Sequence, residues 1–176
     1  MKRMLFMIIP VLCIGMISCN QAPPATPAPA ADNGEANKAI VDTFLKAVRG
    51  GDIKTAGDQL SDTFWSYGPS IKDSTDRAGF IEYWTKRWET EFDSIGYVRY
   101  AQLAATLDSM DWVNEWGHIN VTYKNGTPDI HFNYHGAFRL SDGKIVQYIA
   151  FYNVADILEQ QGFTFVPPAK KEEKKK

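Results

Sequence analysis

The dipeptide Asn125-Gly126 constrains the fold more than any other feature of this sequence, because it stands between two runs of strand-like residues, 112–124 and 127–140. Asn-Gly in such a setting is the strongest short signal for a β-hairpin with a two-residue type I′ turn. We therefore expect the two runs to pair as antiparallel strands. That register places apolar residues opposite one another on one face: Ile119 with Phe132, and Val121 with Ile130.

A second turn extends the sheet. Ser141-Asp142-Gly143 suits a three-residue loop with glycine in the left-handed conformation, after which 144–153 forms a third strand. This predicts three further pairs: Tyr134 with Ala150, Gly136 with Tyr148, and Phe132 with Tyr152. Because side chains alternate along a strand, one face is aliphatic and lined by tyrosines. The other face carries a mixed set: His118, His131, His135, Trp116, Ile149 and Phe151.

Helical patterns precede these strands. Ile40, Phe44 and Val48 recur at four-residue spacing, in a helix that we expect to start with Asp32 and Glu35 as a capping pair and to stop at Gly50-Gly51. Three shorter elements are expected next: a helix capped by Asp52, a strand at 64–67, and a helix that begins at Ser74 or Thr75. A brief helix at 154–161 follows the sheet. Helices followed by a meander predict an α+β domain, with helices on one face of an antiparallel sheet.

The start of the chain predicts a lipoprotein precursor. Lys2 and Arg3 precede an apolar stretch, 5–17, which has the order of a secretory signal. Ser18-Cys19 resembles a bacterial lipobox, except that Met16 stands where leucine is usual. We therefore expect a signal peptide at 1–18, with cleavage and lipid attachment at Cys19. The alternatives are an uncleaved anchor helix and an ordinary signal cut elsewhere.

Both ends of the mature chain read as unstructured. Residues 19–34 are rich in Pro, Ala, Asn and Gln, which predicts a flexible linker between a membrane and the domain at 35–163. Residues 164–176 end in lysines and glutamates and predict a solvated tail, or one that contacts anionic lipid or a cell-wall polymer. Asn20 is not the aspartate that retains many lipoproteins at the inner membrane. We expect anchoring in the outer membrane, facing the periplasm.

Composition excludes several functional classes. Cys13 leaves with the signal and Cys19 carries the lipid, so the domain has no thiol for a disulfide, a nucleophile or a thiolate metal site. Without the signal and the charged tail, 12 basic and 19 acidic residues remain, a net charge of about −7. Such a surface is unsuited to nucleic acid.

The chain resembles the nuclear transport factor 2-like superfamily, in its SnoaL-like branch. The residues that carry the resemblance run through the whole domain: Phe44, Ala47, Gly51-Asp52, Ala56, Leu60-Ser61-Asp62, Gly79-Phe80, Trp84, Trp116-Gly117, Phe138-Arg139-Leu140, Asp142-Gly143-Lys144-Ile145-Val146 and Tyr152-Asn153. The resemblance implies a cone-shaped fold, in which a curled sheet wraps the helices around a pocket. It does not imply one activity, because isomerases, dehydratases, cyclases and binding proteins share the fold.

The implied pocket lacks the carboxylates of the ketosteroid isomerases, which the chain distantly resembles. Their base would fall at Gly68 and their second carboxylate near Gly136. The expected ligand-binding residues are instead aromatic: Tyr67, Trp84, Phe132, Tyr134, Tyr148 and Tyr152. We expect hydroxyl groups to supply the polarity of this pocket, with no ionised group deep inside, so that its ligand is neutral and apolar or aromatic. The alternative for these side chains is a filled core.

The histidines lead to the other hypotheses. His131 and His135 are too far apart along a strand to share one metal ion, so neither a metal nor a cofactor is expected. The first hypothesis is a non-catalytic, membrane-tethered binding domain of the cell envelope. The second is a hydro-lyase, isomerase or cyclase-type enzyme with His118 or His135 as general base, and the third is a structural envelope partner. Because Trp116, Ile149 and Phe151 would leave the outer face apolar, we also expect a homodimer through that face.

Overall fold

The computed structural model describes residues 33–166. The predicted signal peptide, Cys19, most of the linker and the tail from residue 167 lie outside the described residues. The elements follow one another in this order: α1 Gly34–Arg49, α2 Ile53–Asp58, β1 Leu60–Tyr67, β2 Ser74–Asp76, α3 Arg77–Thr90, β3 Phe92–Leu107, β4 Met110–Tyr123, β5 Ile130–Ser141, β6 Lys144–Phe151 and α4 Val154–Gln160. Within 33–166, no helix has the length and apolar character needed to cross a membrane.

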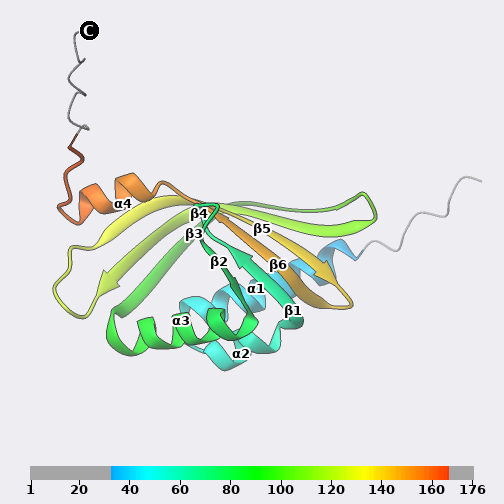
Figure 1. Cartoon of the computed structure of the whole chain (residues 1–176). Helices are drawn as coiled ribbons and strands as arrows, with labels where there is room; N and C mark the ends of the chain where they lie inside the picture. The colour runs from blue at the N-terminus through cyan, green and yellow to red at the C-terminus, as the bar shows by residue number, and fades with distance from the viewer. Residues whose placement is uncertain (1–32, 167–176) are drawn as a thin grey trace, which may run out of the picture. The chain divides into compact units, whose positions relative to one another are not determined.

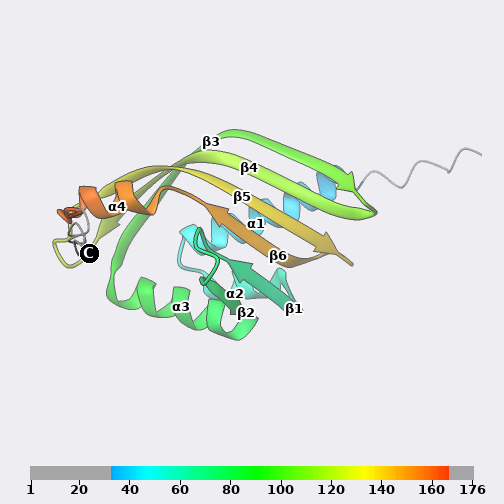
Figure 2. The same cartoon turned by 45° about the horizontal axis from the view of Figure 1, so that its top comes forward.

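The six strands form one curled sheet in the order β2-β1-β6-β5-β4-β3. Helices α1, α2 and α3 lie on one side of this sheet, and α4 lies at one end of it (Figures 1 and 2). The predicted α+β architecture is therefore confirmed, as is the cone-like curl. The expectation of a purely antiparallel sheet is wrong at one pair, because β1 runs parallel to β6.

The first hairpin has the predicted register. Ile119 pairs with Phe132 and Val121 with Ile130. The predicted turn type is wrong, because a type I′ turn needs positive φ at both central residues and only Gly126 has it, at 73°. The last pair of the ladder is Val121 with Ile130, so the connection is longer than two residues.

The second hairpin is shifted by two residues from the prediction. Asp142 and Gly143 both have positive φ, so they form a two-residue turn in place of the expected three-residue loop. An irregularity between Arg139 and Leu140 then sets the remaining register, which pairs Gly136 with Ala150 and Phe138 with Tyr148. A shift of two keeps every side chain on its predicted face, because side chains alternate with a period of two.

The helix boundaries follow from local capping. Asp52 accepts a hydrogen bond from the Thr55 amide at the start of α2, as predicted, and α1 ends at Arg49 with Gly50 as its C-cap. The predicted start of α3 is wrong. Residues 74–76 pair with β1 as strand β2, and the helix begins at Arg77 because the Asp76 carboxylate accepts from the Gly79 amide.

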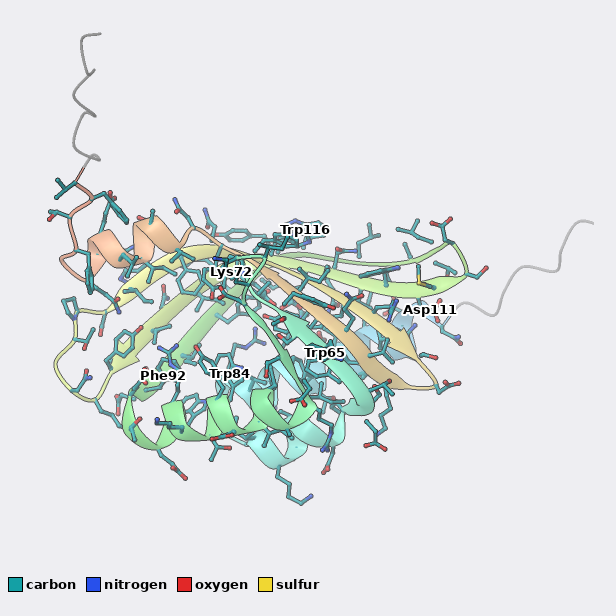
Figure 3. All side chains as sticks on the ribbon, in the orientation of Figure 1. Trp65, Lys72, Trp84, Phe92, Asp111 and Trp116 are labelled. Carbon is teal, nitrogen blue, oxygen red and sulfur yellow. The ribbon has the colours of Figure 1, made fainter. Side chains whose placement is uncertain are left out.

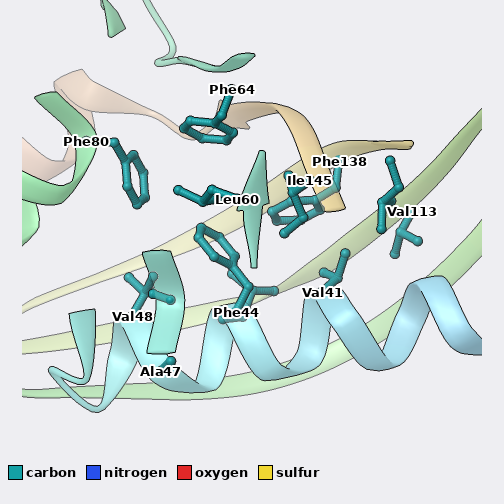
Figure 4. Close-up of a cluster of buried hydrophobic side chains, with 13 residues drawn as sticks. Val41, Phe44, Ala47, Val48, Leu60, Phe64, Phe80, Val113, Phe138 and Ile145 are labelled. Atoms are coloured by element: carbon teal, nitrogen blue, oxygen red, sulfur yellow. The ribbon is translucent and has the colours of Figure 1, made fainter. Parts of the chain in front are cut away.

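The core consists of two buried clusters. The larger lies between α1, α3 and the sheet, where rings from different elements meet (Figure 4): Phe44, Phe64, Phe80 and Phe138. The smaller contains Phe92, Val121 and Ile130 near the other end of the sheet. Trp84 of α3 packs against both clusters.

Helix α4 covers a strand edge. Strand β6 ends at Phe151, which pairs with His135, so the first residues of β5 extend beyond it. There the carboxamide of Gln160 pairs with the backbone of His131. Its Oε1 accepts from the His131 amide at 2.8 Å, and its Nε2 donates to the His131 carbonyl at 2.9 Å.

Candidate functional site

A buried carboxylate, Glu115, lies at the centre of the inner face of the sheet. Its side chain is 0% exposed. Its Oε2 atom accepts hydrogen bonds from Arg99 Nε at 3.0 Å and from Gln102 Nε2 at 3.1 Å. Arg99 also contacts Asp42 of α1, so that one guanidinium joins two carboxylates. This ion-pair network connects α1 to β3 and β4.

A β-bulge brings the partners of Glu115 together. Arg99 and Gln102 are three residues apart, a spacing that would put them on opposite faces of a regular strand. Arg99 pairs with Gly117, but Ala101 pairs with Trp116, which leaves Tyr100 as the extra residue. The bulge therefore turns both side chains to the inner face, toward the same carboxylate.

The other oxygen of Glu115 is less well satisfied. Its Oε1 lies 3.7 Å from Arg49 Nη1 and has no hydrogen-bond partner among the described residues. The guanidinium of Arg49 stacks 3.9 Å from the ring centre of Tyr97. Burial first, and then the nearby Glu115 carboxylate, raise the pKa of Tyr97. Gly117 leaves room for the ring of Tyr97, since a Cβ there would collide with it.

Two tyrosine hydroxyls lie beside this carboxylate. The hydroxyls of Tyr134 and Tyr148 are 2.9 Å apart. Tyr134 lies over Gly136, and Gly136 is the cross-strand partner of Glu115. Burial is the main cause that raises the pKa of both tyrosines, so both remain protonated donors at neutral pH. The expectation of an interior without an ionised group is wrong, because Glu115 supplies a carboxylate one strand away from the empty position at Gly136.

The structure brings five of the six predicted ligand residues to the inner face. Trp84 and Phe132 are half-buried and pack against the smaller cluster, and Tyr148 packs against the larger one. The Tyr152 ring lies 5.3 Å from that of Phe132. Trp84 lies between α3 and the sheet (Figure 3). Tyr67 does not join them, because it pairs with Ile149 and lies on the opposite face.

None of the six predicted residues lines either of two hollows in the described part of the chain. The smaller has a volume of about 40 Å³ and is lined by Asn37, Asp111 and neighbouring residues at the start of α1. The larger has a volume of about 430 Å³ and lies among α3, the β4–β5 connection and the residues that follow α4. Of the predicted residues, Trp84 alone packs against both buried clusters.

The three histidines lie on the outer face of the sheet, away from α1, α2 and α3. His135 is stacked between two rings, 4.8 Å from Trp116 and 5.4 Å from Phe151, and burial lowers its pKa. Trp116 lies on the far side of the sheet from α3 (Figure 3). The ring of His118 stacks 6.1 Å from that of His131. Within residues 33–166, no group of three or more potential ligands is placed to hold a metal ion.

Comparison with solved structures places the fold. An LEH-like epoxide hydrolase of Mycobacterium tuberculosis matches with a TM-score of 0.62 at 15% identity, over 73% of this chain and 91% of that one. A ketosteroid isomerase-like protein of Catenulispora acidiphila, in complex with trimethylamine, gives 0.61 at 14% identity, over 73% and 97%. A protein of Cytophaga hutchinsonii, described as NTF2-like, gives 0.54 at 16% identity, over 69% and 94%.

The chain has the NTF2-like fold. The resemblance seen in the sequence is confirmed at this level. The epoxide hydrolase/cyclase-like enzyme SalBIII, which acts in pyran ring formation in salinomycin, shares the fold with a TM-score of 0.59 at 20% identity, over 69% of this chain and 94% of that one. No family model and no curated protein sequence matches this chain. The NTF2-like fold is compatible with ligand binding and with catalysis.

Sequence reasoning missed the network around Glu115. The register that pairs Trp116 with His135 also pairs Glu115 with Gly136, so the first hairpin alone could have placed this carboxylate on the inner face. Its partners could not be found in that way. Asp42 and Arg49 come from α1, and Arg99 reaches the inner face together with Gln102 through the bulge at Tyr100.

Proposed function

We propose that this NTF2-like domain binds a small, neutral, largely apolar or aromatic molecule on its inner face. The supporting observation is the division of the core. Buried residues form two clusters, and Trp84 packs against both of them. Partly buried rings line each cluster: Tyr148 packs against the larger, Phe132 against the smaller, and Tyr152 lies beside Phe132. Domains of this size usually have one contiguous core. A ligand seated between the clusters would cover these rings and make the core continuous.

The polar groups near these rings favour an uncharged ligand. The hydroxyls of Tyr134 and Tyr148 can orient a carbonyl or hydroxyl group, which is how few polar groups confer specificity on apolar sites. Glu115 is paired with Arg99 and faces Arg49, so its charge is compensated within the protein. A charged ligand would lose its hydration without finding a free partner of opposite sign.

Titration with a fluorescent hydrophobic dye tests the binding site. Purified protein with Cys19→Ala avoids acyl chains that would compete for the dye. We expect Tyr148→Ala to change the affinity for the dye, and candidate lipids or aromatic compounds to displace it. His135→Ala is the matched control, since His135 lies on the outer face of the same strand pair. An equal effect of the two substitutions, or no binding of any dye, contradicts the proposal.

The setting of the domain is proposed from the sequence. A lipid on Cys19 would tether the chain to the outer membrane, on its periplasmic side, with the residues between Cys19 and α1 as the linker. The apolar ligand would then be one that is present in the cell envelope.

The outer face of the sheet is proposed to bind a second copy of the chain. Large apolar side chains remain exposed there, among them Val98, Leu103 and Phe151. The outward positions of strands β4 and β5 carry Arg139 as their one charged residue and no carboxylate. Two acidic domains can approach each other through such a face without bringing like charges together, and depletion of charge with aromatic enrichment is typical of interface cores.

Acid–base catalysis by Glu115 is a second candidate function. It is favoured by the buried Oε1 atom, which lacks a hydrogen-bond partner and lies beside protonated tyrosine hydroxyls. In the hydrolysis of an epoxide, such a carboxylate can take a proton from a water molecule whose oxygen attacks a ring carbon. A tyrosine hydroxyl can donate a proton to the epoxide oxygen as its C–O bond breaks. The histidine-based alternative has less support, because His118 and His135 lie across the sheet from these groups.

A panel of cyclic and terminal epoxides tests this candidate. Proteins of similar structure include an epoxide hydrolase, and epoxide hydrolysis adds one water molecule to the substrate, which mass spectrometry detects. We expect diol formation by the wild type and its loss in Glu115→Gln, while Glu35→Gln retains activity. If the wild-type protein forms no diol from any epoxide in the panel, this candidate is set aside and the binding function stands by itself.

A further inference from the structure

The residues that line the 430 Å³ hollow differ in kind from those of the inner face. The hollow lies among the end of α3, the β4–β5 connection and the turn after α4. Eight residues line it, most of them with planar polar or aromatic side chains: Arg87, Glu91, Tyr123, Asn125, Thr127, Pro128, Gln161 and Phe163. Its volume falls in the range of small-molecule sites, about 300–1,000 Å³.

The charges of this lining cancel. Arg87 Nε lies 2.9 Å from the Glu91 carboxylate. The same guanidinium also lies over the ring of Phe92, at 4.5 Å, and contacts the Tyr83 hydroxyl. Because the cation and the anion are already paired with each other, the hollow offers no uncompensated charge to an ionic ligand.

Hydrogen-bonding capacity remains at several points around the hollow. The Tyr123 hydroxyl accepts from Gln161 Nε2 at 3.4 Å and donates to no other group within residues 33–166. Asn125 Oδ1 is used by the Thr127 amide, whereas the Thr127 hydroxyl makes no hydrogen bond within residues 33–166. The lining thus presents donors and acceptors side by side, from hydroxyl and carboxamide groups.

An aromatic side chain, Phe163, lines the hollow from a backbone position that hydrogen bonds fix. Gly162 has a φ of 89°, which reverses the chain after α4. The amide of Phe163 then donates to the Leu158 carbonyl at 3.0 Å, and the amide of Gly162 donates to that of Glu159 at 2.9 Å. This closing motif of a helix end holds the Phe163 backbone, while its side chain remains 60% exposed.

We propose that this hollow binds a neutral polyhydroxyl ligand of the saccharide class. Sugars offer hydroxyl groups that donate and accept, which matches the mixed carboxamide and hydroxyl lining. Their C–H faces pack against aromatic rings, which Phe163 supplies. A zwitterion would have to separate Arg87 from Glu91, and an apolar ligand would leave the polar groups unpaired. The site is distinct from the inner face and its proposed apolar ligand.

Saturation-transfer difference NMR on the full chain tests the proposal, with maltose, cellobiose and N,N′-diacetylchitobiose as probes. We expect at least one of these disaccharides to bind at millimolar concentration. Phe163→Ala should weaken that binding roughly fivefold or more, as expected for loss of a stacked ring. Phe165→Ala is the matched control. Phe165 is 58% exposed, two residues away, and does not line the hollow.

Three results would overturn the proposal. The first is the absence of saturation transfer to all three disaccharides. The second is an equal effect of Phe163→Ala and Phe165→Ala. The third is binding of the zwitterion glycylvaline in place of the sugars, with dependence on Arg87. Dye binding on the inner face should be unchanged in Phe163→Ala, so failure of this site is distinguishable from failure of the inner-face function.

Discussion

Arg99 Nη2 lies 2.7 Å from Glu115 Oε2, on an arginine whose guanidinium also contacts Asp42 of α1. A surface helix is thereby tied to a carboxylate at the centre of the sheet. The pair differs from three other ion pairs of the described region, which join residues three or four positions apart and each include an exposed side chain. The Arg99–Glu115 pair should therefore contribute more to the free energy of unfolding than those three pairs do.

Replacement of Glu115 should destabilise the fold strongly. Glu115→Ala leaves Arg49 without its nearest carboxylate and opens a cavity in the inner face, and breaking a buried pair costs about 3–5 kcal/mol. Glu35→Ala is the control, because Glu35 is 89% exposed and its pair with Lys38 contributes at most about 1 kcal/mol. Urea unfolding followed by circular dichroism measures both. Similar losses in the two variants would show that the buried network is not a stabilising element.

Self-association should depend on the outer face. We expect light scattering to show a dimer at micromolar concentration for the chain with Cys19→Ala. Leu103→Glu, at a position 55% exposed on β3, should give a monomer because it buries a charge in the contact. Ile71→Glu lies in the β1–β2 connection, where Ile71 is 98% exposed, and should leave the dimer intact. A monomeric parent protein would assign the outer face to another partner.

Stability should fall as the medium becomes mildly acidic, in part through His135. Burial lowers the pKa of His135, so the unfolded chain binds a proton at a pH where the folded chain does not. The free energy of unfolding therefore decreases as the pH falls through the unfolded value, about 6.5, toward the lower folded value. His135→Gln should flatten this dependence between pH 7 and 5.5, measured by thermal unfolding at each pH. If the stability of the variant depended more steeply on pH than that of the wild type, the prediction would be contradicted.

Processing should depend on Cys19. The sequence predicts cleavage after Ser18 and acylation of Cys19, so Cys19→Ala should release the chain from the membrane fraction. Intact-mass analysis of wild-type protein should show a mature chain that begins at Cys19 and carries acyl groups. An unmodified Cys19 in wild-type membranes would exclude the lipoprotein hypothesis and leave the fold and site proposals unaffected.

The sequence was most informative where structure is local. The register predicted from Asn125-Gly126 is the one that β4 and β5 adopt, although the turn type is not. The assignment of residues to faces remains correct despite the two-residue error in the second hairpin. The position of Tyr67 was wrong because a strand of alternating aromatic residues, Trp65 and Tyr67 about Ser66, does not reveal which face is buried. The parallel pairing of β1 with β6 determines which face of β1 is buried, and that pairing joins strands that are far apart in the sequence.

The candidate site was harder to predict for the same reason. A single extra residue, Tyr100, forms a β-bulge that reverses the side-chain alternation of β3, and no pattern in the sequence predicts this bulge. Without the bulge, Arg99 and Gln102 cannot both face Glu115. The hollow near Phe163 likewise depends on how α4 and the β4–β5 connection approach α3, which is a property of tertiary packing.

The pairing of Gln160 with His131 has a consequence for aggregation of the chain. A strand that extends past its neighbour offers unpaired amides and carbonyls to any other extended chain, and such edges promote aggregation. Here a carboxamide, which has the same donor and acceptor as a peptide group, occupies that position. Loss of α4 would thus do more than remove a helix. It would expose the first residues of β5 as an edge to which another molecule could add a strand.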